Sequence, residues 1–106
     1  MERVCFLLRL KKECVDDYLK AHDPVWPEML EAIHDAGIRN YSLFIQKDGM
    51  IVGYMEAENA RESMARVGET DVSRRWEKSV APYFEGDPGK ESRGEPIWLR
   101  QYFYMP

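Results

Sequence analysis

The side chains best suited to proton chemistry stand close together in the first third of the chain. Tyr18 and His22 are four positions apart in the segment YLKAH, so on a helix they lie on the same face, one turn apart. Histidine exchanges protons near neutral pH, and a tyrosine hydroxyl one turn away can bond the same substrate oxygen. This spacing favours a site for acid/base catalysis.

Two further aromatic residues could complete a pocket around this pair. Tyr41 stands near the start of a predicted strand and Trp76 within a predicted helix, and they could add a hydroxyl and a flat apolar wall. A sugar pocket needs both, because the C–H faces of a sugar stack on rings while its hydroxyls take directed hydrogen bonds. The four residues are therefore compatible with a carbohydrate site.

Each of these residues also has a purely structural explanation. A histidine on a semi-apolar helix face is more often hydrogen-bonded within the fold than catalytic. Tyr18 suits the edge of a core, and Trp76 falls on a helical stripe that would be buried in any case. The residues alone leave both explanations open.

Most other catalytic and metal-binding patterns are missing from the sequence. It holds no Ser-His-Asp signature and no GxSxG, P-loop or GxGxxG motif, and no carboxylate pair stands out for glycoside hydrolysis. Cys5 and Cys14 form no CxxC pair and are predicted to be reduced, largely buried thiols. Together with His22 and His34 they lack the spacing of a tetrahedral zinc site.

The segment around His22 is predicted to be helical and then broken by prolines. Apolar residues follow helical spacing over residues 12–22. Pro24 and Pro27 then stop or redirect this helix, and Pro27 also suits the first turn of a second helix that continues through residue 36. Ending the first helix just after His22 would place its side chain at the mouth of a pocket.

The remaining segments read as strands, a second helical region and a loop. Residues 3–10 alternate as a strand with one apolar face, and residues 40–58 form a hairpin around Asp48-Gly49. Residues 60–84 are predicted to be helical, with an interruption near Gly68. Their buried stripe comprises Val72, Trp76, Val80 and Phe84. Residues 85–96 form a loop rich in glycine and charge, and residues 97–105 form the last strand.

The predicted order is β-α-β-β-α-β, with both helical stretches split. This is the order of the ferredoxin-like fold, an α+β protomer whose helices cover one face of a four-stranded antiparallel sheet. Apolar side chains are predicted on both faces of the sheet, with Tyr41, Leu43 and Ile45 opposite Phe44, and with Trp98, Tyr102 and Tyr104 sharing a face. A sheet that is apolar on both faces needs cover on both, so we expect a homodimer that pairs two sheets.

Length and composition predict one globular domain over residues 1–106. The chain has 44% hydrophobic and 32% charged residues and a formal net charge of −4. This acidic balance gives no electrostatic reason to bind nucleic acid or an anionic membrane. It has no apolar run long enough to span a membrane and no basic-plus-apolar leader. We therefore expect a soluble, cytoplasmic protein.

One set of residues resembles a known family along essentially the whole chain. The matching residues are Tyr18-x3-His22-x-Pro24-x-Trp26-Pro27-Glu28, Gly37-x2-Asn40-Tyr41, Thr70-Asp71-Val72 with Arg75-Trp76, and Tyr104-Met105-Pro106. The pattern resembles the L-rhamnose mutarotase family, and its most specific part is the H-x-P-x-W-P-E cluster. The family interconverts the α and β anomers of L-rhamnose on a dimeric α/β barrel of ferredoxin-like protomers.

The resemblance implies a role for each matching position. It makes His22 the proton donor and places Tyr18, Tyr41 and Trp76 in contact with the sugar, with no cofactor and no metal. One position departs from the family pattern, because members carry a second tryptophan directly after the one matching Trp76. Here that position is Glu77, which we expect to touch the substrate and which must stay hydrated or find a hydrogen bond.

Alternative functions remain open at this point. The same chemistry could act on another 6-deoxy sugar or a related aldose, as Glu77 suggests. Dimeric ferredoxin-like barrels also include haem-degrading and small monooxygenase enzymes, in which His22 could ligate iron, although that link rests on fold analogy. A third alternative is a dimer that binds a ligand without catalysis. The general base could be Tyr18, Tyr41 or a water molecule.

Overall fold

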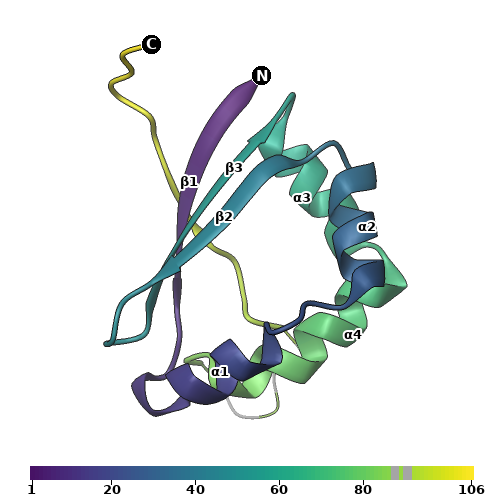
Figure 1. Ribbon diagram of the computed structural model, residues 1–106, viewed down its shortest axis with the longest axis vertical. Helices are drawn as coiled ribbons and strands as arrows, with labels where there is room; N and C mark the ends of the chain where they lie inside the picture. Colours follow the sequence, from purple (N-terminus) through teal and green to yellow (C-terminus); the bar gives the residue numbers. More distant parts are fainter. Residues whose placement is uncertain (87–88, 90–91) are drawn as a thin grey trace.

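A four-stranded antiparallel sheet forms one layer of the molecule, and the helices form the other (Figure 1). The computed structural model describes residues 1–86, 89 and 92–106. The strands are β1 (Glu2–Arg9), β2 (Arg39–Ile45), β3 (Met50–Ala57) and β4 (Ile97–Leu99), in the order β2-β3-β1-β4. This order, with β1 central and β4 beside it, confirms the ferredoxin-like α+β prediction.

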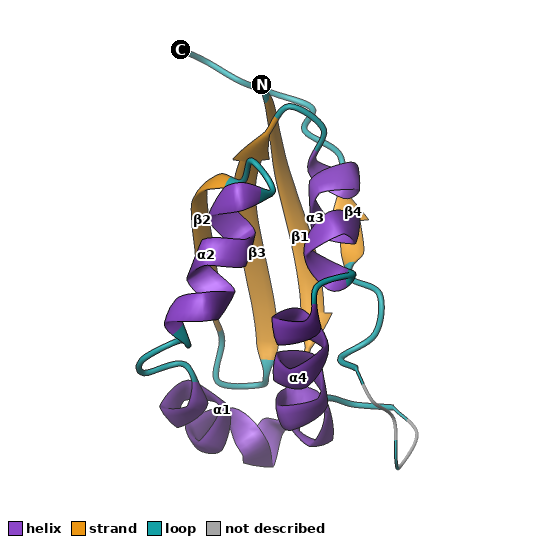
Figure 2. Ribbon diagram, turned by 90° about the vertical axis from the view of Figure 1, so that its right-hand side faces the viewer, coloured by secondary structure: helices purple, strands orange, loops and turns teal. Residues whose placement is uncertain are grey.

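The helices connect the strands in two split crossings that lie on the same side of the sheet (Figure 2). They are η1 (Lys12–Cys14), α1 (Val15–Ala21), α2 (Pro27–Asp35), α3 (Ala60–Gly68), α4 (Asp71–Val80) and η2 (Ala81–Tyr83), where η1 and η2 are single 3₁₀ turns. None of the helices in the described part of the chain is long and apolar enough to cross a membrane.

The prolines end α1 and start α2 as the sequence predicts. His22 is the C-terminal cap of α1, and its backbone N–H contacts the carbonyl oxygens of Tyr18 and Leu19, each at 3.2 Å. Pro27 occupies the first turn of α2, where its missing N–H costs no helical hydrogen bond. The chain therefore leaves α1 at His22 and turns into α2 within a few residues.

The second crossing is broken twice rather than once. The break near Gly68 is present, and α4 starts at a cap in which the Thr70 hydroxyl accepts a hydrogen bond from the backbone N–H of Ser73 at 3.2 Å. The α-helix, however, ends at Val80, so the predicted helix to residue 84 is wrong at its end. Pro82 has no N–H to continue an α-helix. The backbone becomes extended at Phe84, which forms an isolated β-bridge with Leu10, the residue after β1.

The core lies between the sheet and the helices. Its largest fully buried side chains are Phe6, Phe84, Leu10, Ile51, Met55 and Val80. Gly53 of β3 lies opposite Phe6 of β1, and a methyl group on Gly53 would run into the Phe6 ring. The absence of a side chain at Gly53 therefore leaves the space that the Phe6 ring occupies.

A Gly53→Ala variant should be destabilised by about 1–3 kcal/mol, because an added methyl group overpacks a filled core. Urea denaturation of the purified variant measures this loss. Gly68→Ala is the matched control, because nothing lies within 4 Å of the position of its new methyl group. It ends a helix and should be neutral or slightly stabilising. Equal stability of the two variants would contradict the packing argument.

The other face of the sheet carries apolar side chains and points away from the helices (Figure 2). Phe44 of β2 pairs with Val52 of β3, Leu7 of β1 pairs with Val52 and with Ile97 of β4, and the exposed fraction of Phe44 is 64%. We call this surface the open face. Its residues are Cys5, Leu7, Phe44, Val52, Tyr54, Ile97 and Leu99.

The last strand is shorter than predicted, and the side chain of Trp98 packs on the helix-covered face of the sheet. β4 ends at Leu99, and residues 100–106 extend beyond the sheet beside the N-terminus (Figure 1). The Trp98 ring packs on Phe6 in the helix-covered layer, at a centroid distance of 5.6 Å, whereas Tyr102 and Tyr104 lie beyond the end of the strand. Alternation of side chains predicts extended chain, but only a neighbouring strand makes it part of a sheet.

Candidate active site

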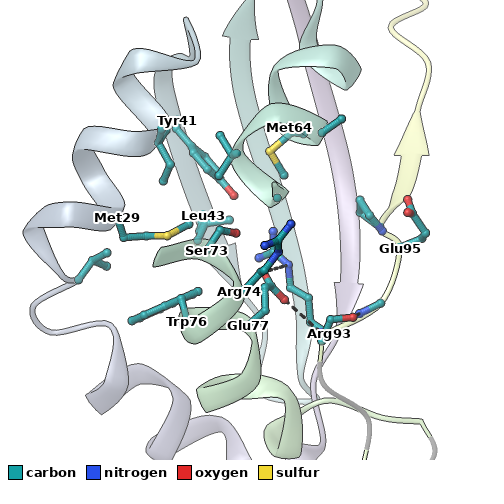
Figure 3. Close-up of a pocket in the computed structure, with 18 of the residues that line it drawn as sticks. Met29, Tyr41, Leu43, Met64, Ser73, Arg74, Trp76, Glu77, Arg93 and Glu95 are labelled. Atoms are coloured by element: carbon teal, nitrogen blue, oxygen red, sulfur yellow. Dashed lines mark hydrogen bonds and ion pairs between the residues drawn. The ribbon is translucent and has the colours of Figure 1, made fainter. Parts of the chain in front are cut away.

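A cleft of about 1040 Å³ opens between the helices and one end of the sheet. Its wall combines residues from the end of α1, from α2, α4 and β2, and from the segment before β4. The residues that matter for chemistry are His22, Tyr41, Trp76, Glu77 and Arg93. Tyr41 and Arg93 point into it from opposite sides (Figure 3). The cleft is large enough to admit a monosaccharide with its hydration.

His22 is held between two aromatic rings at the end of α1. The His22 and Tyr18 ring centroids are 4.3 Å apart, and the Trp76 ring meets His22 edge to face at 4.9 Å and 82°. The Nδ1 atom lies 3.3 Å from the backbone carbonyl oxygen of Tyr18. A carbonyl can only accept, so this contact assigns the proton of the neutral ring to Nδ1 and leaves Nε2 as an acceptor.

The surroundings of His22 favour its neutral form. Burial lowers the pKa of His22 below its ordinary value, and the Arg93 charge lowers it further, while the contact with the Tyr18 carbonyl opposes them. The ring is therefore neutral at pH 7. A neutral imidazole whose Nε2 is free of protons can accept one from a hydroxyl and return it.

Tyr18 lies beneath His22 rather than on the wall of the cleft. Its side chain is 4% exposed, and its ring meets Phe84 edge to face at 5.4 Å. Burial raises the pKa of Tyr18 to about 12, although the Arg93 charge opposes the rise. The hydroxyl therefore stays protonated at neutral pH, which makes it a poor general base.

Trp76 and Trp26 form a perpendicular aromatic pair behind His22. Their ring centroids are 5.0 Å apart at 87°, and Trp76 is 5% exposed. Trp76 thus belongs to the core stripe of α4 and also lines the cleft, so its burial fits the structural explanation and its position is compatible with the functional one. Its ring fixes the orientation of the imidazole from one side.

Tyr41 lies on the helix-covered face of β2 with Leu43, next to an irregularity of the strand. The register of β2 against β3 shifts between Arg39 and Ser42, and Asn40 adopts a positive φ of 50°. The Tyr41 side chain still follows the alternation of the strand, because Leu43, two positions later, lines the same cleft. The Tyr41 ring rests on the edge of Phe6 at a centroid distance of 6.2 Å, and its hydroxyl points into the cleft (Figure 3).

Glu77 is paired with an arginine that the sequence did not single out. The Glu77 Oε1 atom lies 3.1 Å from Nε of Arg93, and its Oε2 accepts a hydrogen bond from the Arg93 backbone N–H at 3.1 Å (Figure 3). The side chains are 18% and 14% exposed. Arg93 stands in a loop without periodicity, so no spacing could reveal it. The one available signal was Glu77 itself, a charge on a helix face that needs a partner.

The cleft thus brings together four of the five residues named from the sequence, with the fifth directly beneath them. In the part of the chain that the structure describes, no group of three or more His, Cys, Asp or Glu side chains is arranged to hold a metal ion. The chemical groups on the wall are an imidazole acceptor, a phenol hydroxyl, aromatic surface and a charged pair. These groups can move protons on a hydroxylated ligand.

Two of the solved structures that share this fold match almost the whole chain. One is an L-rhamnose mutarotase from Formosa agariphila, with a TM-score of 0.81, 23% sequence identity and full coverage of both chains. The other is an antibiotic biosynthesis monooxygenase, with a TM-score of 0.63, 18% identity and coverage of 96% of this chain and 99% of that one. At these identities the likeness concerns the fold alone.

Sequence relatives are more specific. The family model described as L-rhamnose mutarotase matches residues 3–105. An L-rhamnose mutarotase from Jannaschia sp. (strain CCS1) is 31% identical over 106 residues, which is 100% of both chains. One from Burkholderia orbicola (strain MC0-3) is 37% identical over 97 residues, covering 92% of this chain and 89% of the relative. The chain therefore belongs to the L-rhamnose mutarotase family.

Proposed function

We propose that this protein catalyses the interconversion of the α and β anomers of L-rhamnose. The observation that carries the proposal is the position of His22 at the cleft, with Nδ1 held by a backbone carbonyl and Nε2 left as a proton acceptor. The names of the relatives supply the sugar. Ring opening and closing of a sugar needs this kind of reversible proton transfer.

The proposed reaction moves one proton onto the ring oxygen and one off the anomeric hydroxyl. Nε2 of His22 takes the proton from the hydroxyl on C1, the C1–O5 bond breaks, and the carbonyl of the open aldehyde forms. The Tyr41 hydroxyl, directly or through a water molecule, supplies a proton to O5. Rotation about C1–C2 and the reverse steps close the other anomer, so that His22 acts as proton donor in the closing direction.

The other residues bind and orient the sugar in this proposal. A C–H face of the ring stacks against the aromatic surface around Trp76. Tyr18 supports the imidazole from below and keeps its own proton, since its pKa is about 12. Glu77 contributes to the polar wall through its contacts with Arg93. The mechanism uses side chains of this chain and no cofactor.

Saturation-transfer proton NMR on equilibrated L-rhamnose tests the proposal. One anomeric proton is irradiated, and the loss of signal at the other measures the exchange rate. The protein should accelerate the exchange well above buffer at catalytic concentration. Exchange at the buffer rate with folded protein would overturn the proposal for L-rhamnose.

A second candidate is the same reaction on another aldose. The ion pair of Glu77 and Arg93 favours this alternative, because it puts charge where the family pattern has aromatic surface. The same NMR measurement on L-fucose and L-mannose, at matched concentrations, ranks the three sugars. A faster exchange of either one would reassign the substrate and leave the chemistry unchanged.

The proposal includes a cytoplasmic homodimer without nucleic-acid or membrane partners. The open face supports the dimer, because large apolar side chains such as Phe44, Ile97 and Leu99 are exposed on it. Two such faces packed together would form a closed barrel-like assembly. The net charge of −4 supports the absence of polyanionic partners.

A Phe44→Lys substitution should convert the dimer to monomers, because it places a charge in an apolar interface. Size-exclusion chromatography with light scattering measures the change in mass. Leu19→Lys in α1 is the matched control, since Leu19 is exposed on the helix layer and should leave the mass unchanged. A monomeric wild-type protein at micromolar concentration would refute the dimer.

A further inference from the structure

The Arg93 side chain is more deeply held than a loop arginine usually is. It is 14% exposed and crosses the cleft to reach α4 (Figure 3). Both carboxylate oxygens of Glu77 are engaged with Arg93, one at the Nε atom and one at the backbone N–H. The Tyr41 side chain also lies close enough to the guanidinium to interact with it electrostatically. Its position is therefore fixed from two elements of the fold.

Stability alone does not account for this pair. Removing two charges from water is costly, and well-packed apolar residues in place of a buried ion pair often stabilise a protein equally or better. The pair also lies on the cleft wall, next to the proposed acid/base group, and its charge acts on His22 and Tyr18. A role toward the ligand fits this placement.

The chemistry of the guanidinium limits what it can recognise. It carries five N–H donors and no acceptor. Of the residues that the structure describes, Glu77 pairs with the Nε atom at 3.1 Å, and Tyr41 lies close to the guanidinium. The N–H groups that face the cleft offer hydrogen bonds to oxygen atoms of water or of a ligand, and an apolar group there would leave them unpaired.

We infer that Arg93 is a specificity-determining residue that donates a hydrogen bond to one ring hydroxyl of the sugar, and that Glu77 positions it. The inference rests on the proposed function. In this arrangement each Glu77 oxygen contacts Arg93, so the main role of Glu77 is to position the guanidinium. The Tyr41 hydroxyl, which points into the cleft (Figure 3), gives its proton to the substrate.

The test removes the proposed hydrogen bond in two ways, by a substitution of Arg93 on the protein and by a missing hydroxyl on the sugar. The exchange rate is measured for L-rhamnose and for its 2-deoxy, 3-deoxy and 4-deoxy analogues, with wild type and with Arg93→Met. The variant should lower kcat/KM for L-rhamnose by about 10- to 100-fold, the range of one hydrogen bond to a charged group. For one of the deoxy sugars the same substitution should have almost no effect, because the contact is already absent.

Two further variants separate contact from folding. Arg93→Met leaves Glu77 unpaired and can unfold the chain, so Arg93→Met/Glu77→Met removes both charges and should fold. It should show the same insensitivity to the same deoxy sugar. Glu77→Gln keeps one acceptor for Nε and should give a smaller loss on that same hydroxyl, a signature that general structural damage would not produce.

The outcomes distinguish this inference from the function on which it rests. The wild-type protein could accelerate exchange while both Arg93 variants lower kcat/KM by the same factor for L-rhamnose and for every deoxy sugar. Arg93 would then bind no ring hydroxyl, and the inference would be wrong. If wild type does not accelerate L-rhamnose exchange at all, the proposed function fails and this inference fails with it.

Discussion

Replacing His22 by glutamine should lower the rate of anomer exchange by about 10²- to 10⁴-fold, the usual contribution of a positioned acid/base group. Glutamine keeps a polar side chain of similar reach but cannot accept a proton near neutral pH. Because His22 is only half-buried and caps α1 through its backbone, the variant should remain folded. Saturation-transfer NMR at matched enzyme concentration gives the rate, and circular dichroism checks the fold.

His34→Gln is the control for this substitution. His34 lies in the last turn of α2, and its side chain is well exposed, with Asp35 at 3.7 Å. Its loss should leave the exchange rate unchanged. A His22→Gln variant that keeps more than a third of the wild-type rate would remove the imidazole from the mechanism and shift the search for the base to Tyr41 or water.

The same histidine predicts the pH dependence of the reaction. The pKa of His22 is lowered by burial and by Arg93, so the neutral base persists below pH 6.5 and the rate falls only when the pH drops through this lowered value. Arg93→Met removes one of the two causes and leaves the Glu77 carboxylate nearby. The acid limb of the rate profile should then move to higher pH. A profile that does not move would show that the Arg93 charge does not act on His22.

Replacing Trp76 by alanine should cost about 3–5 kcal/mol of folding stability, the usual cost of removing a large buried aromatic side chain. The ring is almost fully buried and contacts both His22 and Trp26. Urea denaturation measures the loss. The rate should fall as well, even where the protein stays folded, because the imidazole loses the ring that orients it.

Trp98→Ala is the matched comparison. Trp98 is partly buried against Phe6 and lies under the Arg61 guanidinium, so its loss should cost less stability than that of Trp76. Trp76→Phe keeps an aromatic ring and should recover part of the stability and part of the rate. A Trp76→Ala variant as stable as wild type would mean that the core closes over the cavity without loss.

The sequence predicted the fold well where an element depends on a few neighbouring residues. The position of Pro27 fixed where α2 begins, and the Asp48-Gly49 turn fixed the β2–β3 hairpin. The alternation in residues 3–10 correctly separated the core face of β1 from the open face. Each of these signals depends on a few neighbouring residues, whose backbone preferences the tertiary structure did not override.

The failures arose where the outcome depends on distant partners. The four-residue spacing that ends at Phe84 predicted a helix, but Phe84 is extended and pairs with Leu10 through its backbone. Its side chain is nevertheless buried, as the spacing predicts. The alternation of residues 97–105 predicted a long strand, but β4 pairs with β1 only as far as Leu99. Spacing describes which side chains share a face, and it does not say which strand, if any, lies alongside.

The site divides in the same way. Helical spacing and the family resemblance pointed to His22, Tyr41 and Trp76, and the structure places all three on one cleft. The loop that delivers Arg93 has no periodic signal, whereas Tyr41 lies on the face that its alternation with Leu43 and Ile45 predicts. Glu77 was visible as a departure from the family pattern, but its partner sixteen residues away could only be found in three dimensions.

The ion pair between Glu77 and Arg93 also constrains how this chain can evolve. Losing either residue alone leaves a buried charge without its partner, at a cost of about 3–5 kcal/mol, which is a large share of the stability of a small domain. Losing both together avoids that cost. The effect of a mutation at one position therefore depends on the residue at the other, and each single mutant that removes the pair is less favourable than the double mutant. In a mutational scan, substitutions at the two positions should therefore be strongly non-additive, with the double mutant more stable than either single mutant.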